Sequence, residues 1–286
     1  LKLSYEDACD LVVEGLAPLG EDYGSLLRRG FAEGWVDVCE TPGKRSGAYS
    51  TGIFGLHPYV LLNYQQTTSD IFTIAHEMGH ALHTYYSNAN QPYAKADYRI
   101  FVAEVASTVN EVLLLRHILS KTKDEKMRAY LLNYFLDMVR ATLHRQTMFA
   151  EFEAIAHGMV EKGTPLTSEN LSEEYLRLNR LYYGDAIVHD EQIAYEWSRI
   201  PHFYTSFYVY KYSTGIVSAI SIADRILTEG GAAVADYKKF LSSGGSDGPV
   251  ELLKIAGVDL TTRAPFEAAM HAFAETLDQL EKLLIK

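Results

Sequence analysis

The sequence is poor in cysteine and in positive charge. Only two cysteines, Cys9 and Cys39, occur among 286 residues, which is too few for a disulfide scaffold and lacks the paired spacing of a cysteine metal site. A reducing, cytoplasmic setting is therefore expected. Lys and Arg number 26 against 37 Asp and Glu, so the net charge is -11. Because nucleic-acid binding depends on a surplus of basic residues, we expect no nucleic-acid partner.

Long hydrophobic runs are also missing. The longest, such as 112–115 and 130–132, end at charged or polar residues, far short of the roughly 20 apolar residues of a membrane span, so we expect no membrane association. The first 16 residues contain four acidic side chains where a signal peptide requires an apolar stretch. Position 1 is Leu, and we expect the chain to be a fragment or processed product of a longer protein.

Apolar residues at helical spacing dominate what remains. The chain is 48% hydrophobic, enough for a large core, and we expect one domain over 1–286. The fold class predicted is mainly α with a small antiparallel β-sheet within 36–64, where Gly, Val, Tyr and Ile alternate. Helices are predicted at 4–16, 69–87, 99–120, 124–161, 168–182, 190–199, 205–229, 232–242, 249–255 and 264–284.

The chemistry concentrates in the run H-E-M-G-H at 76–80. On a helix, His76 and His80 lie on one face, four residues apart, and can reach one metal ion. Glu77 projects beside that ion and can accept a proton from a bound water, which is the H-E-x-x-H pattern of zinc peptidases. Two core histidines that merely hydrogen-bond to neighbours are the alternative. An ionisable Glu within an apolar helix favours the metal site.

A catalytic zinc ion takes three protein ligands and keeps one position for water. Glu104, the carboxylate among apolar and small residues in the next predicted helix, is the favoured third ligand. Glu111, seven residues later on the same face, could replace it, or could hold the free nitrogen of a ligating histidine. We favour the second role for Glu111. His83 also shares the face of His80 and is interpreted as a local hydrogen-bond partner.

These motifs closely resemble oligoendopeptidase F, of the thimet oligopeptidase family. The resemblance rests on HEMGHALH at 76–83 and FVAEVAS at 101–107, and extends through RSGAY at 45–49, HPYVLLNY at 57–64, RQTMFAEF at 145–152 and IPHFY at 200–204. It covers essentially the whole chain. Members of that family are considerably longer, so the resemblance implies that this chain is the C-terminal catalytic part without its N-terminal lobe.

The resemblance implies a zinc endopeptidase, with one zinc ion per chain, that hydrolyses short unstructured peptides. His76, His80 and Glu104 match the family's zinc ligands and Glu77 its catalytic glutamate. In that family a late segment supplies His and Tyr side chains that bind the oxyanion, and residues 202–215 of this chain match it. Tyr210 is the best match to the oxyanion-binding tyrosine, with His202 and Tyr204 as companions that also bind substrate.

The predicted sheet has two interpretations. If 59–64 or the strand before it lies at an exposed edge, a peptide could add to that edge through main-chain hydrogen bonds; otherwise the segment is a packed hairpin. Two other functions remain open. A different zinc hydrolase would use Glu111, Asp97 or a histidine as third ligand, and a non-catalytic helical module would bind peptides without cleaving them.

Overall fold

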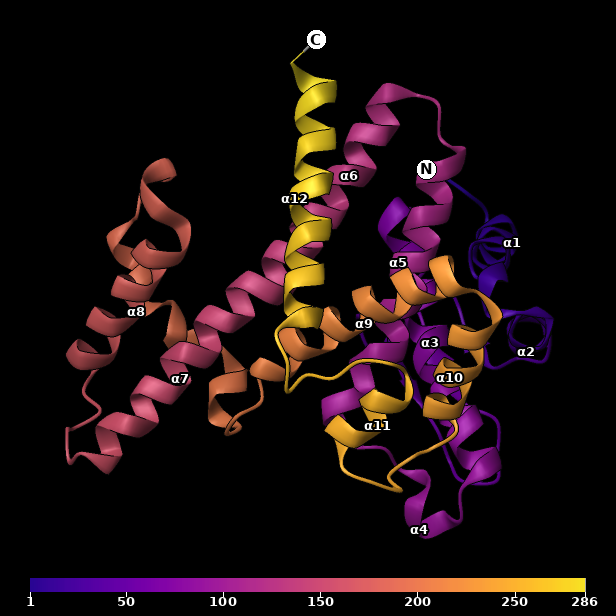
Figure 1. The fold of residues 1–286 in the computed structure, drawn as a ribbon, viewed down its shortest axis with the longest axis horizontal. Coiled ribbons are helices and arrows are strands. Elements are labelled where there is room, and N and C mark those ends of the chain that lie inside the picture. The colour runs from indigo at the N-terminus through magenta and orange to yellow at the C-terminus, as the bar shows by residue number, and fades with distance from the viewer. Residues whose placement is uncertain (286) are drawn as a thin grey trace. The chain divides into compact units, whose positions relative to one another are not determined.

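The computed structural model describes residues 1–285 and divides into two compact units (Figure 1). The first unit contains Leu1–Phe135 and the segment that begins at Gly215, and the second contains Leu136–Thr214. The boundaries fall inside two helices, α6 (Glu125–Val139) and α9 (Tyr210–Glu229). The predicted fold class, mainly helical with a small sheet, is confirmed. None of the helices in 1–285 is long and apolar enough to cross a membrane.

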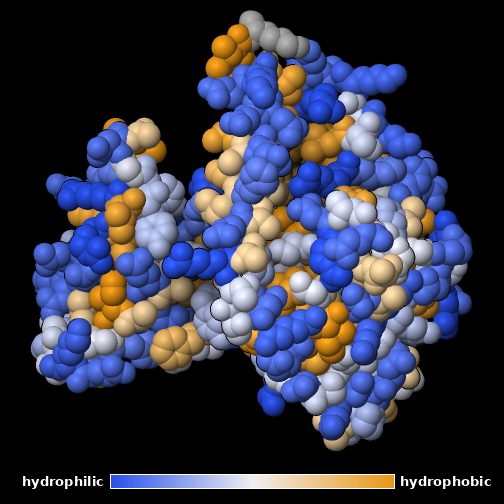
Figure 2. Space-filling model, viewed as in Figure 1, coloured by the Kyte–Doolittle hydropathy of each residue, from blue (hydrophilic) through white to orange (hydrophobic). Residues whose placement is uncertain are grey.

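The first unit is built around two long helices, α3 (Thr68–Asn90) and α5 (Ile100–Lys121). Its other elements are α1 (Tyr5–Gly15), η1 (Ala17–Leu19), α2 (Glu21–Ala32), β1 (Val36–Asp37), β2 (Tyr49–Thr51), β3 (Tyr59–Leu61), α4 (Tyr93–Ala96), α10 (Gly231–Leu241), α11 (Pro249–Ile255) and α12 (Ala264–Leu284). Figure 2 shows hydrophilic residues along the side of α12 that faces the viewer, with apolar residues at its flanks. Its buried residues, among them Ala269 and Leu280, lie on another face.

The second unit has its own apolar core. It contains the π-helix η2 (Arg140–His144), the α-helices α7 (Arg145–Glu161) and α8 (Ser168–Tyr183), and the 3-10 helices η3 (Gly184–Ala186), η4 (Glu191–Arg199) and η5 (Pro201–Tyr204). Phe149 and Phe152 of α7 pack with Tyr175 of α8 and with Val209, the residue before α9. The core therefore joins α7 to the segment that leads into α9.

Helix α3 begins at a capping box. The side chain of Thr67 accepts a hydrogen bond from the Asp70 backbone N–H at 3.2 Å, and the Asp70 carboxylate accepts one from the Thr67 N–H at 2.9 Å. These two bonds satisfy backbone donors that the first turn of a helix leaves free. The start of the helix that carries 76–80 is therefore fixed by local sequence.

Helices α3 and α5 approach so closely that their backbones touch at Gly79. A Cβ atom at this position would lie 2.6 Å from the Ser107 Cα and 2.7 Å from the Ala106 carbonyl oxygen. The buried Asn110 adds a directional contact, because its side-chain amide donates to the Ala75 carbonyl at 3.0 Å and accepts from the Tyr23 hydroxyl at 3.0 Å. Packing and hydrogen bonding together fix the register of α5 against α3.

The sheet is mixed rather than antiparallel throughout. Strand β3 lies in the middle, pairing antiparallel with β2 and parallel with β1. The prediction therefore describes the β2–β3 pair but not the parallel pairing of β1 with β3. Since β3 is paired on both sides, the exposed edge next to it belongs to β2 or β1.

Several helices differ from prediction for identifiable reasons. Helix α2 was not among the predicted helices; within it, Gly30 allows close contact with Trp35 and Met78. The predicted helix at 124–161 is interrupted by the π-helix η2. The segment 190–199 is 3-10 rather than α-helical, and α9 begins at Tyr210 rather than at 205.

Replacing Gly79 with Ala is expected to destabilise the protein by about 2 kcal/mol, because the added methyl group meets backbone atoms that cannot rotate away. Urea-induced unfolding measures the change. Gly24→Ala is the matched control, since a Cβ at that helical position meets only the flexible end of Arg28 at 3.5 Å, and it should be neutral or stabilising. An equal change in the free energy of unfolding in both variants would contradict the close contact between α3 and α5 at Gly79.

Candidate metal centre

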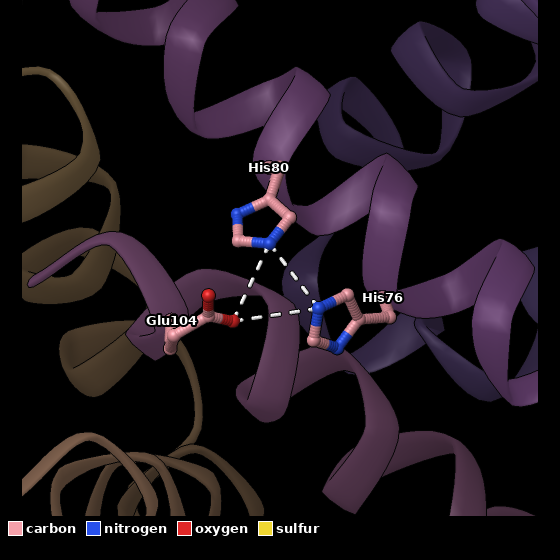
Figure 3. Close-up of side chains that lie close together, drawn as sticks. All are labelled: His76, His80 and Glu104. Atoms are coloured by element: carbon pink, nitrogen blue, oxygen red, sulfur yellow. Dashed lines mark hydrogen bonds and ion pairs between the residues drawn. The ribbon is translucent and has the colours of Figure 1, made fainter. Parts of the chain in front are cut away.

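Three donor atoms from two helices point toward one another (Figure 3). Nε2 atoms of His76 and His80, both on α3, lie 3.2 Å apart, and Oε2 of Glu104 on α5 lies 3.4 Å from each of them. Among residues 1–285, these three form a group of ligand-type side chains close enough to hold one metal ion. The structure therefore brings together the two histidines of the motif and the favoured third residue.

The spacing of the three atoms fits zinc. With Zn–N and Zn–O distances of about 2.0–2.2 Å, neighbouring ligand atoms of a tetrahedral site lie roughly 3.3–3.5 Å apart. The two distances of 3.4 Å from Glu104 lie within this range, and the 3.2 Å between the histidine nitrogens lies just below it. Two imidazoles and one carboxylate are also a donor set that catalytic zinc sites use, with a fourth position left for water.

Glu77 lies beside this group but is not part of it. Its side chain is 6% exposed, and Oε2 is buried with no hydrogen-bond partner among residues 1–285. Burial raises the pKa of Glu77 above its ordinary value, against the opposing effect of His76 and His80. A buried carboxylate oxygen without a partner is costly, and a water molecule between Glu77 and an ion would satisfy it.

Glu111 holds the other nitrogen of His76. Its Oε1 lies 2.6 Å from His76 Nδ1, on the side of the ring opposite to Nε2. Carboxylates in this position fix the tautomer and orientation of a ligating histidine. The geometry thus supports the predicted division of roles between Glu104 and Glu111.

The carboxylates of Glu104 and Glu111 favour positive charge at the two histidines. Burial would lower the pKa of His76, but its hydrogen bonds to Glu104 and Glu111 raise it to about 10. Burial would likewise raise the pKa of Glu104, but its hydrogen bonds to His76 and His80 hold it well below the ordinary range. A metal ion supplies the charge that these shifts favour.

His83 differs from its expected role. Its ring is buried and stacks on Tyr98 with 3.7 Å between centroids, and its Nδ1 has no hydrogen-bond partner among the described residues. Burial lowers the pKa of His83 to about 3. The side chain packs as a neutral ring rather than acting as a local hydrogen-bond partner through Nδ1.

Strand β2 follows α3 past the two histidines. Gly47 and Ala48, which precede β2, line a cavity of about 230 Å³ together with Thr73, and a Cβ at Gly52, just after β2, would meet Thr84. Thr73 and Thr84 lie on either side of 76–80 along the helix. Addition of a peptide to the edge of β2 therefore remains a prediction. Strand β3 cannot serve as that edge, because it is paired on both sides.

The predicted oxyanion-binding residues lie in the second unit. His202 Nε2 is 3.2 Å from the Tyr212 hydroxyl, and its ring centroid is 5.2 Å from that of Tyr208. Tyr204 is 77% exposed, and its hydroxyl donates to the Ser198 carbonyl at 3.3 Å. The Tyr210 ring lies 5.4 Å from the Lys211 ammonium.

Tyr212, which is not among the predicted site residues, is the tyrosine whose hydroxyl lies next to His202. It follows Tyr210 by two positions, and nothing in a run rich in aromatic residues distinguishes one tyrosine hydroxyl from the next. The His202–Tyr212 separation of ten residues includes the non-helical stretch before α9. Only the path of that stretch decides which tyrosine reaches His202.

Comparisons with known proteins identify a family of peptidases. A model of peptidase family M3 matches residues 12–272. The chain is 50% identical to oligopeptidase PepF of Bacillus subtilis over all of its length and 43% of that protein. The crystal structure of oligoendopeptidase-F from Enterococcus faecium matches 98% of the chain and 44% of its own, with 38% identity and a TM-score of 0.75. A crystal structure from Chlamydophila abortus matches 99% of the chain and 48% of its own, with 44% identity and a TM-score of 0.91.

The chain thus spans less than half the length of each of these proteins.

Replacing Glu111 with Gln should weaken metal binding about 10- to 100-fold, because the charge that orients His76 is lost while the shape is kept. Competition with a chelating dye measures the dissociation constant. Glu14→Gln is the control, since Glu14 also lies beside a histidine, His117, at 3.7 Å. Unchanged affinity in the Glu111 variant would show that this carboxylate does not support the site.

Proposed function

Because the chain belongs to peptidase family M3, we propose that it is the catalytic part of a zinc-dependent endopeptidase that hydrolyses short, unstructured oligopeptides. The observation that carries the proposal is the convergence of His76, His80 and Glu104, at distances that fit zinc, next to the buried carboxylate of Glu77. Oligopeptidase and oligoendopeptidase are the names of the relatives, and the activity proposed here extends them to this chain.

In this proposal His76, His80 and Glu104 hold one zinc ion. Zinc held there would act as a Lewis acid toward a water molecule and toward the carbonyl of the scissile bond. The third residue is Glu104 rather than Glu111, since the Glu111 carboxylate is engaged with the opposite nitrogen of His76. This arrangement disfavours the alternative hydrolase in which Glu111 is the third ligand.

Glu77 acts as the general base. Its unpartnered Oε2 can accept the proton of the attacking water. The protonated Glu77 then donates that proton to the departing amine. Water is the nucleophile, so no acyl-enzyme forms.

His202 and a tyrosine of the second unit are proposed to donate hydrogen bonds to the oxyanion of the transition state. Tyr210 is the tyrosine that the family resemblance favours, and Tyr212 is the one whose hydroxyl lies next to His202. Tyr204 is proposed to contact substrate, with its ring exposed. Donors of this kind accelerate the reaction because they bind charge that develops only in the transition state.

The remaining proposals concern the setting of the enzyme. Cys9 and Cys39 are both free thiols, which supports a reducing, cytoplasmic location. The longer relatives support the proposal that an N-terminal lobe accompanies this catalytic part. Peptides are the proposed partners.

Replacing Glu77 with Gln should lower kcat/KM by at least about 100-fold while one zinc ion per chain is retained, because the amide cannot accept the proton. Cleavage of a quenched fluorescent oligopeptide and metal content by mass spectrometry measure the two quantities. Glu281→Gln, at an exposed position of α12, is the control. Zinc without cleavage by the unmodified chain would favour a peptide-binding module instead, and absence of zinc would refute the metal site.

Replacing Tyr212 and Tyr210 separately with Phe distinguishes the two candidate donors. Removal of the hydroxyl that binds the oxyanion should lower kcat about 100-fold and leave KM nearly unchanged. We expect the larger effect for Tyr212 because its hydroxyl contacts His202. Steady-state kinetics measures both constants. Loss of affinity with normal turnover in both variants would exclude this role for either tyrosine.

A further inference from the structure

The segment between η5 and α9 contains a backbone corner that an aromatic residue rarely forms. Phe207 has φ of 55°, in the left-handed region. A bulky side chain is disfavoured there, at a cost of about 1–3 kcal/mol. Such a conformation persists only where surrounding contacts determine it, so the contacts of Phe207 identify what holds this segment.

A buried carboxylate on α7 holds the backbone corner at Phe207. Glu153 of α7 is 4% exposed, and its Oε1 accepts a hydrogen bond from the Phe207 backbone N–H at 2.5 Å. None of the ion pairs within residues 1–285 includes Glu153. A buried carboxylate without a cation depends on its hydrogen-bond donors, so the backbone N–H and the carboxylate satisfy each other.

Two further contacts fix the same residue. The Phe207 ring, which is 49% exposed, stacks on His157, one turn beyond Glu153 on α7, with 4.5 Å between centroids. The Phe207 carbonyl accepts a hydrogen bond from Lys211 Nζ at 2.7 Å. The backbone N–H, the side chain and the carbonyl of one strained residue are therefore all engaged.

The corner determines where the neighbouring polar aromatic groups lie. His202 precedes it, and Tyr208 and Tyr212 follow it. The three rings nevertheless form one cluster, with His202 Nε2 3.2 Å from the Tyr212 hydroxyl and 5.7 Å between the rings of Tyr208 and Tyr212. Because the chain must reverse at Phe207 for this cluster to form, its geometry depends on the left-handed backbone.

We propose that Glu153 is a positioning residue for this catalytic segment. Its carboxylate holds Phe207 in the left-handed conformation and thereby sets the distance between His202 and Tyr212. The inference rests on the proposed function, in which these side chains meet the oxyanion. Glu153 itself touches no reacting atom and acts through the backbone of Phe207.

The central variant is Glu153→Leu, which keeps the side-chain size and removes the acceptor. We expect kcat to fall about 100-fold, as for a misplacement of about 1 Å in a catalytic group, while KM changes by less than about threefold. Glu153→Gln keeps an acceptor oxygen and should retain kcat within about threefold of the unmodified chain.

A second substitution tests whether the corner is the cause. Glycine adopts positive φ without strain. The double variant Glu153→Leu with Phe207→Gly should therefore have a kcat at least about tenfold higher than that of Glu153→Leu alone. The matched control is Glu151→Leu on the same helix, which removes an acceptor of the Tyr182 hydroxyl at 2.9 Å. We expect no change of kcat in this control.

Hydrogen exchange at the Phe207 amide gives a readout that does not depend on activity. The amide should be protected in the unmodified chain and in Glu153→Gln, and should exchange at least about tenfold faster in Glu153→Leu. Normal kcat in Glu153→Leu, or unchanged exchange, would overturn the inference. Failure of the unmodified chain to cleave peptides would count against the proposed function, and the exchange rates would still decide whether Glu153 holds Phe207.

Discussion

At Gly79 the backbone of α3 lies directly against α5 around Ala106 and Ser107. The glycine falls between the two histidines of the motif, and Ala106 and Ser107 directly follow the turn that carries Glu104. The closest contact between the helices is thus within one turn of every residue in the candidate metal centre. Any side chain at Gly79 would move Glu104 away from His76 and His80, so the separation of the donor atoms depends on the absence of a Cβ.

The two units position their functional groups in different ways. In the first unit, regular helices carry the groups, and the capping box at Thr67 and the Asn110 hydrogen bond set their register. In the second unit, His202 and Tyr212 are brought together by an irregular segment that passes through a strained residue. The helical arrangement is rigid because backbone meets backbone. The irregular one depends on the contacts of Phe207, among them the hydrogen bond to the buried Glu153 carboxylate.

The positions of groups carried by regular helices could be predicted from the sequence, and the positions of groups carried by the irregular segment could not. Residues 76–80 lie within one helix, so their spacing alone places His76 and His80 on one face, and Glu104 could be found because a carboxylate among apolar residues needs a partner. Helix α2 was not among the predicted helices, although acidic residues open it and Arg29 lies in its last turn. What the sequence alone does not show is that Gly30 packs against Trp35 and Met78. The contact of Tyr212 with His202 could not be predicted either, since no glycine marks the backbone corner at Phe207.

A metal ion bound as proposed would couple the fold to the supply of metal, because its three ligands lie on both α3 and α5. Glu104 meets the histidines only when the two helices are packed, so an ion held by all three residues is lost when they separate. A ligand that binds only the folded state raises the free energy of unfolding, by about 2.7 kcal/mol at a concentration 100 times its dissociation constant. In a cell short of metal, the population of unfolded chains open to degradation would rise, and the amount of protein would follow metal availability.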